Sequence, residues 1–230
     1  MADQALPRTN PIPCPFFHLK EPGSAITHLI GAVLSVAATP GLLIRAAEKG
    51  AATLQLAALS VFLLSMTALY TASTLYHSLD LPCGRNHILK KLDHIMIFFL
   101  IAGTYTPICL TVLKGIGGEG LLLNVWVVAL GGTLLKLLWV NHPKWLSSII
   151  YIAMGWLCLT EFPAILAQMD ARGFWWLLLG GILYTVGGVV YALKLDRLNR
   201  LHPNFGSHEI FHLFVLAGSF CHYMTMFYLF

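Results

Sequence analysis

The C-terminal stretch opens Gly206-Ser207-His208-Glu209-Ile210-Phe211-His212 and runs to Phe230 with little but apolar, small and aromatic residues after Glu209. Its length suits a helix across a hydrocarbon core of about 30 Å. Residues four apart lie on one helix face, so the imidazoles of His208 and His212 can reach one metal ion. Polar groups inside a membrane helix are costly and usually mark function, which makes this helix the reference for the rest of the chain.

The composition is that of a membrane protein. Of 230 residues, 57% are hydrophobic and 10% charged, and the mean hydropathy is +0.75. Soluble domains carry about 25% charged residues, so we predict a polytopic all-α membrane protein. The net charge of +4 is spread over loops, which argues against nucleic-acid binding. The five cysteines are scattered without CxxC spacing and are expected to be free thiols.

Seven apolar runs of about 20 residues predict a bundle of seven transmembrane helices. Residues 1–20 are proline-rich and are expected to form an irregular tail without a signal peptide, followed by one transmembrane domain over residues 21–230. The third span is expected to begin near Asp93 and to be interrupted at Pro107. The predicted spans are 25–44, 54–76, 92–113, 121–140, 145–166, 174–193 and 209–229. Gly-Gly pairs at 131–132, 180–181 and 187–188 are expected to let neighbouring backbones approach closely.

The loop cations predict the orientation. With the N-terminus in the cytoplasm, ten Lys and Arg residues fall inside and four outside, which favours a cytoplasmic N-terminus and an outside C-terminus. We therefore expect a multi-pass protein of the inner (plasma) membrane. The inside cations are Arg8, Lys20, Arg85, Lys90, Lys91, Lys136, Lys144, Lys194, Arg197 and Arg200, and the outside ones are Arg45, Lys49, Lys114 and Arg172.

This topology places several polar side chains at one depth. The second span ends at His77, with Ser73 one turn deeper, and the third begins near Asp93. The seventh span begins on the same side with His208, and His212 lies about 6 Å deeper at about 1.5 Å per residue. Residues from three helices are therefore expected to meet in one layer near the cytoplasmic face.

Three motifs that contain these residues, together with the entry to the first span, resemble those of the hemolysin III family, which is related to the progestin and adiponectin receptors and, more distantly, to alkaline ceramidases. The resemblance covers about residues 20–230, and the length and short tail resemble bacterial members. Ser24 stands where that family commonly has Asn. The motifs are Glu21-x5-Thr27-His28-x2-Gly31, Ser73-x3-His77, Asp93-His94-x8-Gly103-Thr104-Tyr105-Thr106-Pro107, and His208-x3-His212 followed by His222.

The resemblance implies a seven-helix bundle in which His77, His208 and His212 hold Zn²⁺, with Asp93 near the metal and its water and Ser73 one turn below the first ligand. Reasoning from the residues agrees, because three imidazoles and one open position are typical of catalytic zinc. Zinc lowers the pKa of a bound water to about 7. Asp93 would hold or deprotonate that water, and Ser73 would donate to it, to Asp93 or to a developing oxyanion. We therefore predict a zinc-dependent hydrolase of lipid amide or ester bonds, with a membrane lipid as substrate.

Several residues keep other interpretations open. His208 and His212 can be helix-cap or interfacial histidines, and Asp93 can be an acid in the first turn of a helix. Ser73 can be a small packing residue. His222 lies about 15 Å from His212, too deep for the same metal, and is expected to make an interhelical hydrogen bond. The remaining assignments are loop or interface roles for His28 and His94, and no partner for the intramembrane Glu161.

Other functions also fit parts of the sequence. His208-Glu209-Ile210-Phe211-His212 is a literal HExxH, in which Glu209 would serve as the base of a zinc protease. Its third ligand would have to come from upstream, and the family it resembles does not use this glutamate in catalysis. The further alternatives are a receptor or sensor in which zinc is structural, and a membrane-lytic protein as the family name suggests.

Overall fold

The structure is a computed structural model that describes residues 19–139, 143–193 and 206–230. Seven helical segments in these ranges are long and apolar enough to cross a membrane, which confirms the predicted seven-helix fold. Residues 1–18 of the expected tail, and Lys194, Arg197 and Arg200 of the last loop, lie outside the described residues. The elements are α1 (Pro22–Glu48), α2 (Thr53–Ser78), α3 (Cys83–Thr111), α4 (Gly118–Leu138), α5 (Lys144–Gly155), the 3₁₀ turn η1 (Leu157–Glu161), α6 (Phe162–Gln168), α7 (Ala171–Leu193) and α9 (Ser207–Leu229).

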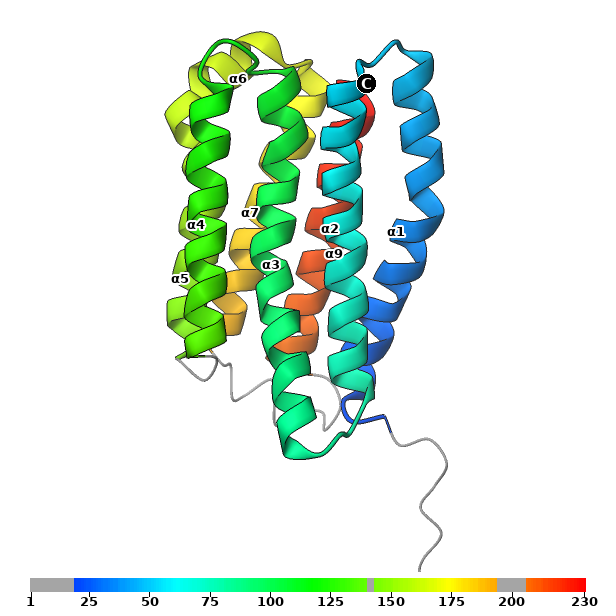
Figure 1. Ribbon diagram of the computed structural model, residues 1–230, viewed down its shortest axis with the longest axis vertical. Coiled ribbons are helices and arrows are strands. Elements are labelled where there is room, and N and C mark those ends of the chain that lie inside the picture. The colour runs from blue at the N-terminus through cyan, green and yellow to red at the C-terminus, as the bar shows by residue number, and fades with distance from the viewer. Residues whose placement is uncertain (1–18, 140–142, 194–205) are drawn as a thin grey trace, which may run out of the picture.

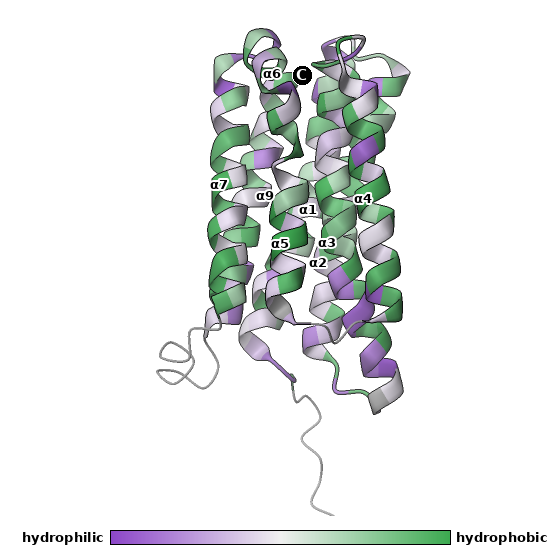
Figure 2. Cartoon of the chain, turned by 90° about the vertical axis from the view of Figure 1, so that its left-hand side faces the viewer, coloured by the Kyte–Doolittle hydropathy of each residue, from purple (hydrophilic) through white to green (hydrophobic). Residues whose placement is uncertain are grey.

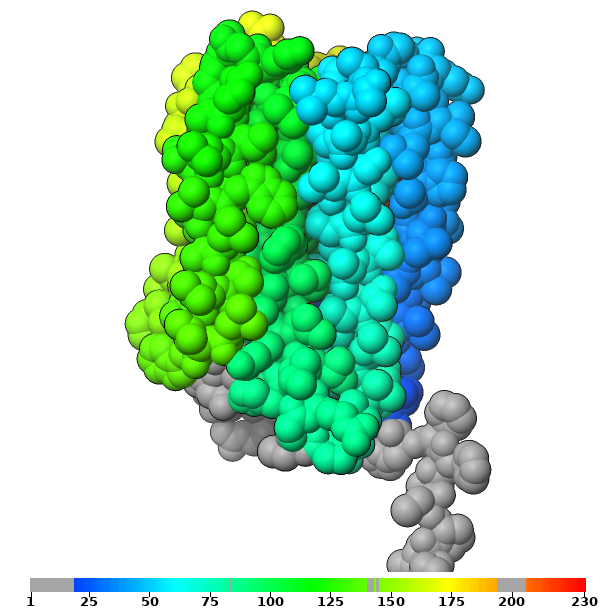
Figure 3. All heavy atoms as spheres, viewed as in Figure 1, coloured from blue at the N-terminus to red at the C-terminus, as the bar shows by residue number. Residues whose placement is uncertain are grey.

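The helices run side by side in one bundle (Figure 1). They close into a ring: from α1 to α4 each helix packs on the next, α4 contacts α5 and η1, α5 packs on α7, α7 on α9, and α9 returns to α1. The first turns of α1, α3 and α9 and the last turn of α2 lie together at one end, which we call the site end; the C-terminus lies at the opposite end. In the space-filling view the side chains of α1 to α4 cover one side of the bundle (Figure 3). Which end faces the cytoplasm stays a prediction.

The outer surface is apolar in the way that a lipid environment requires. Leu64 is 67% exposed, Leu123 65% and Val33 61%, while Phe62 and Phe98 are fully buried inside the ring. Figure 2 shows hydrophobic residues along the length of the helices and hydrophilic ones gathered toward the site end of α3 and α4. Hydrocarbon cannot form hydrogen bonds with exposed peptide groups. These apolar segments therefore fold as helices, in which the backbone N–H and C=O groups bond to one another.

The third helix, α3, differs from the prediction both in where it begins and in its continuity at Pro107. It begins at Cys83, so Asp93 lies well inside the helix rather than near its start, and it continues through Pro107 to Thr111. The expected interruption at Pro107 is therefore wrong. A break at membrane depth would leave several backbone groups without partners, whereas a proline inside a continuous helix removes one bond.

The fifth predicted span, 145–166, is not one helix. α5 ends at Gly155, and η1 and α6 complete the crossing, with Pro163 in the first turn of α6. Tyr105 of α3 stabilises the break, because its hydroxyl donates to the carbonyl of Gly155 at 2.7 Å and accepts from the N–H of Cys158 at 2.9 Å. A side chain of a neighbouring helix thus replaces the backbone bonds that the break removes.

The glycine pairs make room for side chains rather than for neighbouring backbones. A Cβ on Gly132 of α4 would lie 2.3 Å from the ring of Phe98, whereas a Cβ on Gly131 would have nothing within 4 Å. In each of the other pairs one glycine also lies against a side chain: a Cβ on Gly180 would lie 2.9 Å from the ring of His222, and one on Gly187 would lie 2.7 Å from the Cβ of Phe214.

Gly132→Ala is therefore expected to destabilise the bundle, by about 1–3 kcal/mol, because Phe98 is fully buried and must move. Gly131→Ala is the matched control in the next position and is expected to leave stability unchanged or raise it slightly. Thermal unfolding in detergent measures both. Equal melting temperatures for the two variants would contradict the assignment of Gly132 to the Phe98 contact.

Candidate metal centre

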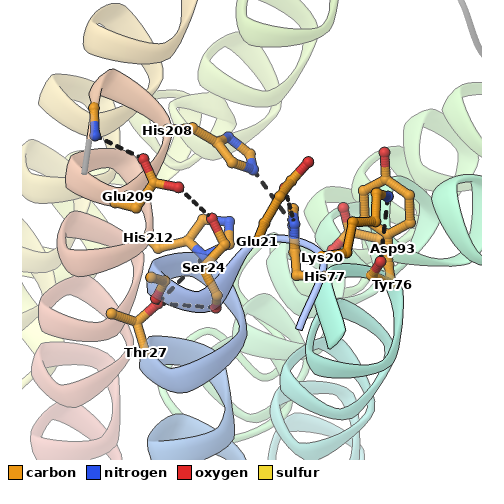
Figure 4. A network of polar contacts seen from close by, with 12 residues as sticks. Lys20, Glu21, Ser24, Thr27, Tyr76, His77, Asp93, His208, Glu209 and His212 are labelled. Carbon is orange, nitrogen blue, oxygen red and sulfur yellow. Dashed lines mark hydrogen bonds and ion pairs between the residues drawn. The ribbon is translucent and has the colours of Figure 1, made fainter. Parts of the chain in front are cut away.

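Three histidines from two helices converge at the site end (Figure 4). His77 lies in the last turn of α2, and His208 and His212 in the first two turns of α9; one ring nitrogen of each lies within 4.8 Å of the others. The Nε2 atoms of His77 and His208 are 3.3 Å apart. Two nitrogens bound to one tetrahedral zinc at about 2.0–2.1 Å are separated by about 3.3 Å, so the spacing and the donor set fit such an ion.

Residues at the start of α1 orient two of these imidazoles. The Glu21 carboxylate contacts Nδ1 of His77, and the Thr27 hydroxyl lies 3.5 Å from Nδ1 of His212. With Nδ1 engaged in this way, Nε2 is the nitrogen left to bind a metal, as in carboxylate–histidine–metal arrangements. The hydrogen bond from His77 also holds the pKa of the Glu21 carboxyl below its ordinary value, against the opposing effect of partial burial.

Glu209, the glutamate of the HExxH pattern, has a structural partner on each oxygen. It accepts from the N–H of Gly206 at 2.8 Å and from the hydroxyl of Ser24 at 2.7 Å. The first contact caps α9 and the second ties α9 to α1. Ser24, the residue that departs from the family pattern, therefore takes part in fixing the start of the ligand helix.

Asp93 and Ser73 lie beside the three histidines. Among the described residues, the group whose ligand atoms fall within 4.8 Å of one another consists of the histidines, and Asp93 is outside it. Its buried carboxylate lies 3.3 Å from Nδ1 of His94, with the buried Ser73 hydroxyl nearby. Asp93 and the α9 histidines line the same cavity. The alternative of a first-turn acid is wrong, because α3 begins at Cys83.

Of the loop and interface roles expected for His28, the loop role is wrong. His28 is a buried residue of α1, and its ring stacks on that of His212 with centroids 3.7 Å apart. A stripe of small and polar residues at i, i+4, i+7 and i+11 of this apolar helix was the available signal. The stripe consists of Ser24, His28, Gly31 and Ser35, all buried.

One cavity extends from the histidine cluster through the bundle. At the site end its lining includes Asp93, His208 and His212, and beyond them the walls are mainly aliphatic and aromatic side chains of α3, α5, α7 and α9. It reaches Phe162 and Ile165 of α6, at the other end of the bundle. The cavity is therefore polar at the histidines and mainly apolar along the rest of its length.

The comparison with known families agrees with this geometry. A family model described as "Haemolysin-III related" matches residues 16–223. The chain belongs to the haemolysin-III related family. The resemblance identified from the four sequence motifs is thus confirmed.

Individual relatives of this haemolysin-III chain cover most of its length. It is 42% identical over 204 residues to "Hemolysin-3 homolog" of Bacillus subtilis (strain 168), covering 88% of this chain and 91% of the relative. "Hemolysin-3" of Bacillus cereus is 40% identical over 203 residues, and the match covers 88% of each of the two chains. A more distant relative is "Adiponectin receptor protein" of Drosophila melanogaster, which is 27% identical over 237 residues. The match covers 88% of this chain and 49% of that protein.

Replacement of Glu21 by Gln is expected to weaken metal binding by about 10–100-fold, since partners of metal-binding histidines typically contribute that much. Glu48→Gln, at the exposed far end of the same helix, is the control. Zinc affinity measured by competition with a chelator tests this. Unchanged affinity in Glu21→Gln would show that the Glu21–His77 contact does not orient the ligand.

Glu209→Gln is expected to lower stability by about 1 kcal/mol through a weakened cap while leaving bound metal unchanged. Thermal unfolding and metal analysis of the purified variant give the two readouts. A fully stable variant that had lost turnover with its metal retained would instead favour a protease-like base.

Proposed function

We propose that this haemolysin-III protein is a zinc-dependent hydrolase of amide or ester bonds in membrane lipids. The observation that carries the proposal is the position of three imidazoles and a separate buried carboxylate at the polar end of a long apolar cavity. Three protein ligands leave one position of a tetrahedral ion open, as in catalytic zinc sites. Bound zinc would supply a water molecule activated at neutral pH.

The surrounding residues have distinct roles in this proposal. His77, His208 and His212 would hold the metal, and Glu21 keeps the first of them oriented. Asp93 lines the same cavity as His208 and His212 but stands outside the ligand group, and in this proposal it accepts a proton from the attacking water. Ser73, buried and without a hydrogen-bond partner in the structure, is available to donate to the oxygen that becomes negative.

The cavity defines the substrate class. An acyl chain would lie between the aliphatic walls, with its carbonyl carbon at the histidines. Water adds across the C–N or C–O bond, the carbonyl carbon gains the hydroxyl, and the amine or alcohol leaves with a proton. Exclusion of bulk water by the apolar walls strengthens the electrostatic interactions at the reacting centre.

Asp93→Asn is the decisive variant. It is expected to retain zinc and fold but to lose at least about 100-fold in hydrolysis, because the general base is removed. A His77→Ala, His208→Ala, His212→Ala triple variant should lose the metal, and His87→Ala, an exposed histidine of α3, should keep metal and turnover. Zinc content and hydrolysis of ceramide and related lipids in detergent are the measurements.

Two outcomes would overturn the proposal. Equal metal content in the triple variant and the unmodified protein would remove the metal centre. Bound zinc without hydrolysis across lipid classes, together with unchanged packing in Asp93→Asn, would indicate a receptor or sensor in which the metal is structural.

A further inference from the structure

A second polar position lies in the cavity, at a distance from the metal centre. Tyr184 of α7 and His222 of α9 both line it, with ring centroids 5.0 Å apart. His222 is ten residues beyond His212 on the same helix, which places it about 15 Å farther into the bundle at about 1.5 Å per residue. Among the described residues it does not make the interhelical hydrogen bond that the sequence led us to expect, since neither ring nitrogen has a hydrogen-bond partner there and Nδ1 is fully buried.

The two rings are seated by reciprocal glycines. A Cβ on Gly180 of α7 would lie 2.9 Å from Cε1 and Nε2 of His222, and a Cβ on Gly218 of α9 would lie 2.5 Å from the Tyr184 ring. Each helix therefore has a glycine where the other presents a polar aromatic ring. This arrangement holds both rings in the interior, where an uncompensated polar group is expensive.

The hydrogen bonds of this cluster leave donor capacity toward the cavity. Tyr70 donates to Ser219 at 2.6 Å, and Ser219 lies 2.8 Å from the Tyr184 hydroxyl. When the Ser219 hydroxyl donates its hydrogen bond to the oxygen of Tyr184, the O–H of Tyr184 is left free to donate a hydrogen bond to a ligand in the cavity. Other hydroxyls in this part of the wall are used within their own helices, that of Thr104 by Leu100 and that of Thr185 by Gly181.

We propose that Tyr184 and His222 form a binding site for an oxygen atom in the middle of a bound acyl chain, a hydroxyl or keto group about twelve carbons from the carboxyl end. The inference rests on the proposed function in one respect, that the polar end of the chain lies at the histidines. At about 1.3 Å of advance per C–C bond, an extended chain reaches the depth of His222 near that carbon. A hydroxyl there accepts from Tyr184 and donates to the less buried ring nitrogen of His222, Nε2.

The test compares the binding of 12-hydroxystearate, stearate and 18-hydroxystearate to the metal-containing protein in detergent, by displacement of a fluorescent fatty acid. We expect 12-hydroxystearate to bind about fivefold or more tightly than either of the others, the gain typical of one or two buried hydrogen bonds. Tyr184→Phe and His222→Phe should each abolish this preference while keeping stearate affinity and metal content.

Tyr223→Phe is the matched control, since its hydroxyl donates to the carbonyl of Ala38 at 3.2 Å and it does not line the cavity. It should keep the full preference. If His222→Phe does not fold, Tyr184→Phe alone tests the inference. Absence of a preference in the unmodified protein, a preference that survives in both site variants, or no binding of any of the three acids would overturn the inference. The first two results would overturn only this inference, because the metal and hydrolysis measurements that test the proposed function do not depend on them.

Discussion

The approach of three imidazoles from α2 and α9 constrains how the surrounding helices meet. For His77 to face His208, α2 must end and α9 must begin at the same level of the bundle. α1 must then enter closely enough for Glu21 to reach His77. Gly31 permits this approach, because a Cβ there would lie 2.7 Å from Leu216 and 2.8 Å from Tyr70. The packing of α1 between α2 and α9 is thus tied to the chemistry of the site.

The same helix pair is fixed at its far end by a different interaction. Arg45 of α1 donates from Nε to the carbonyl of Phe227 at 3.1 Å, and its guanidinium lies 3.9 Å from the centre of the Phe227 ring. One of the last carbonyls of α9 is thereby satisfied by a cation, which also favours the negative end of the helix dipole. With the Ser24–Glu209 contact at the site end, α1 and α9 are held in one register. A metal centre needs this rigidity, because ligand distances tolerate only small displacements.

The sequence predicted those features that depend on local periodicity. Apolar runs gave the seven crossings, and the spacing of His208 and His212 placed them on one helix face. His77 came from a depth argument and a family resemblance, since no local pattern joins residues so far apart in the chain. The break after Gly155 and the stacking of His28 on His212 could not be predicted. Both depend on contacts from other helices, Tyr105 in one case and α9 in the other, that only the folded bundle brings together.

Several of the buried polar groups that lack hydrogen-bond partners among the described residues lie along the cavity. The side chains of His28, Ser148 and His222 lack a partner at one or more atoms, and all three line the cavity; Ser73 lies beside Asp93. Each such group costs about 1–3 kcal/mol when left unpaired in the interior. A bundle that only needed stability would replace them with apolar side chains of similar volume. Under the functions proposed above, a bound lipid with polar groups at those depths would offer hydrogen-bond partners to the side chains that line the cavity.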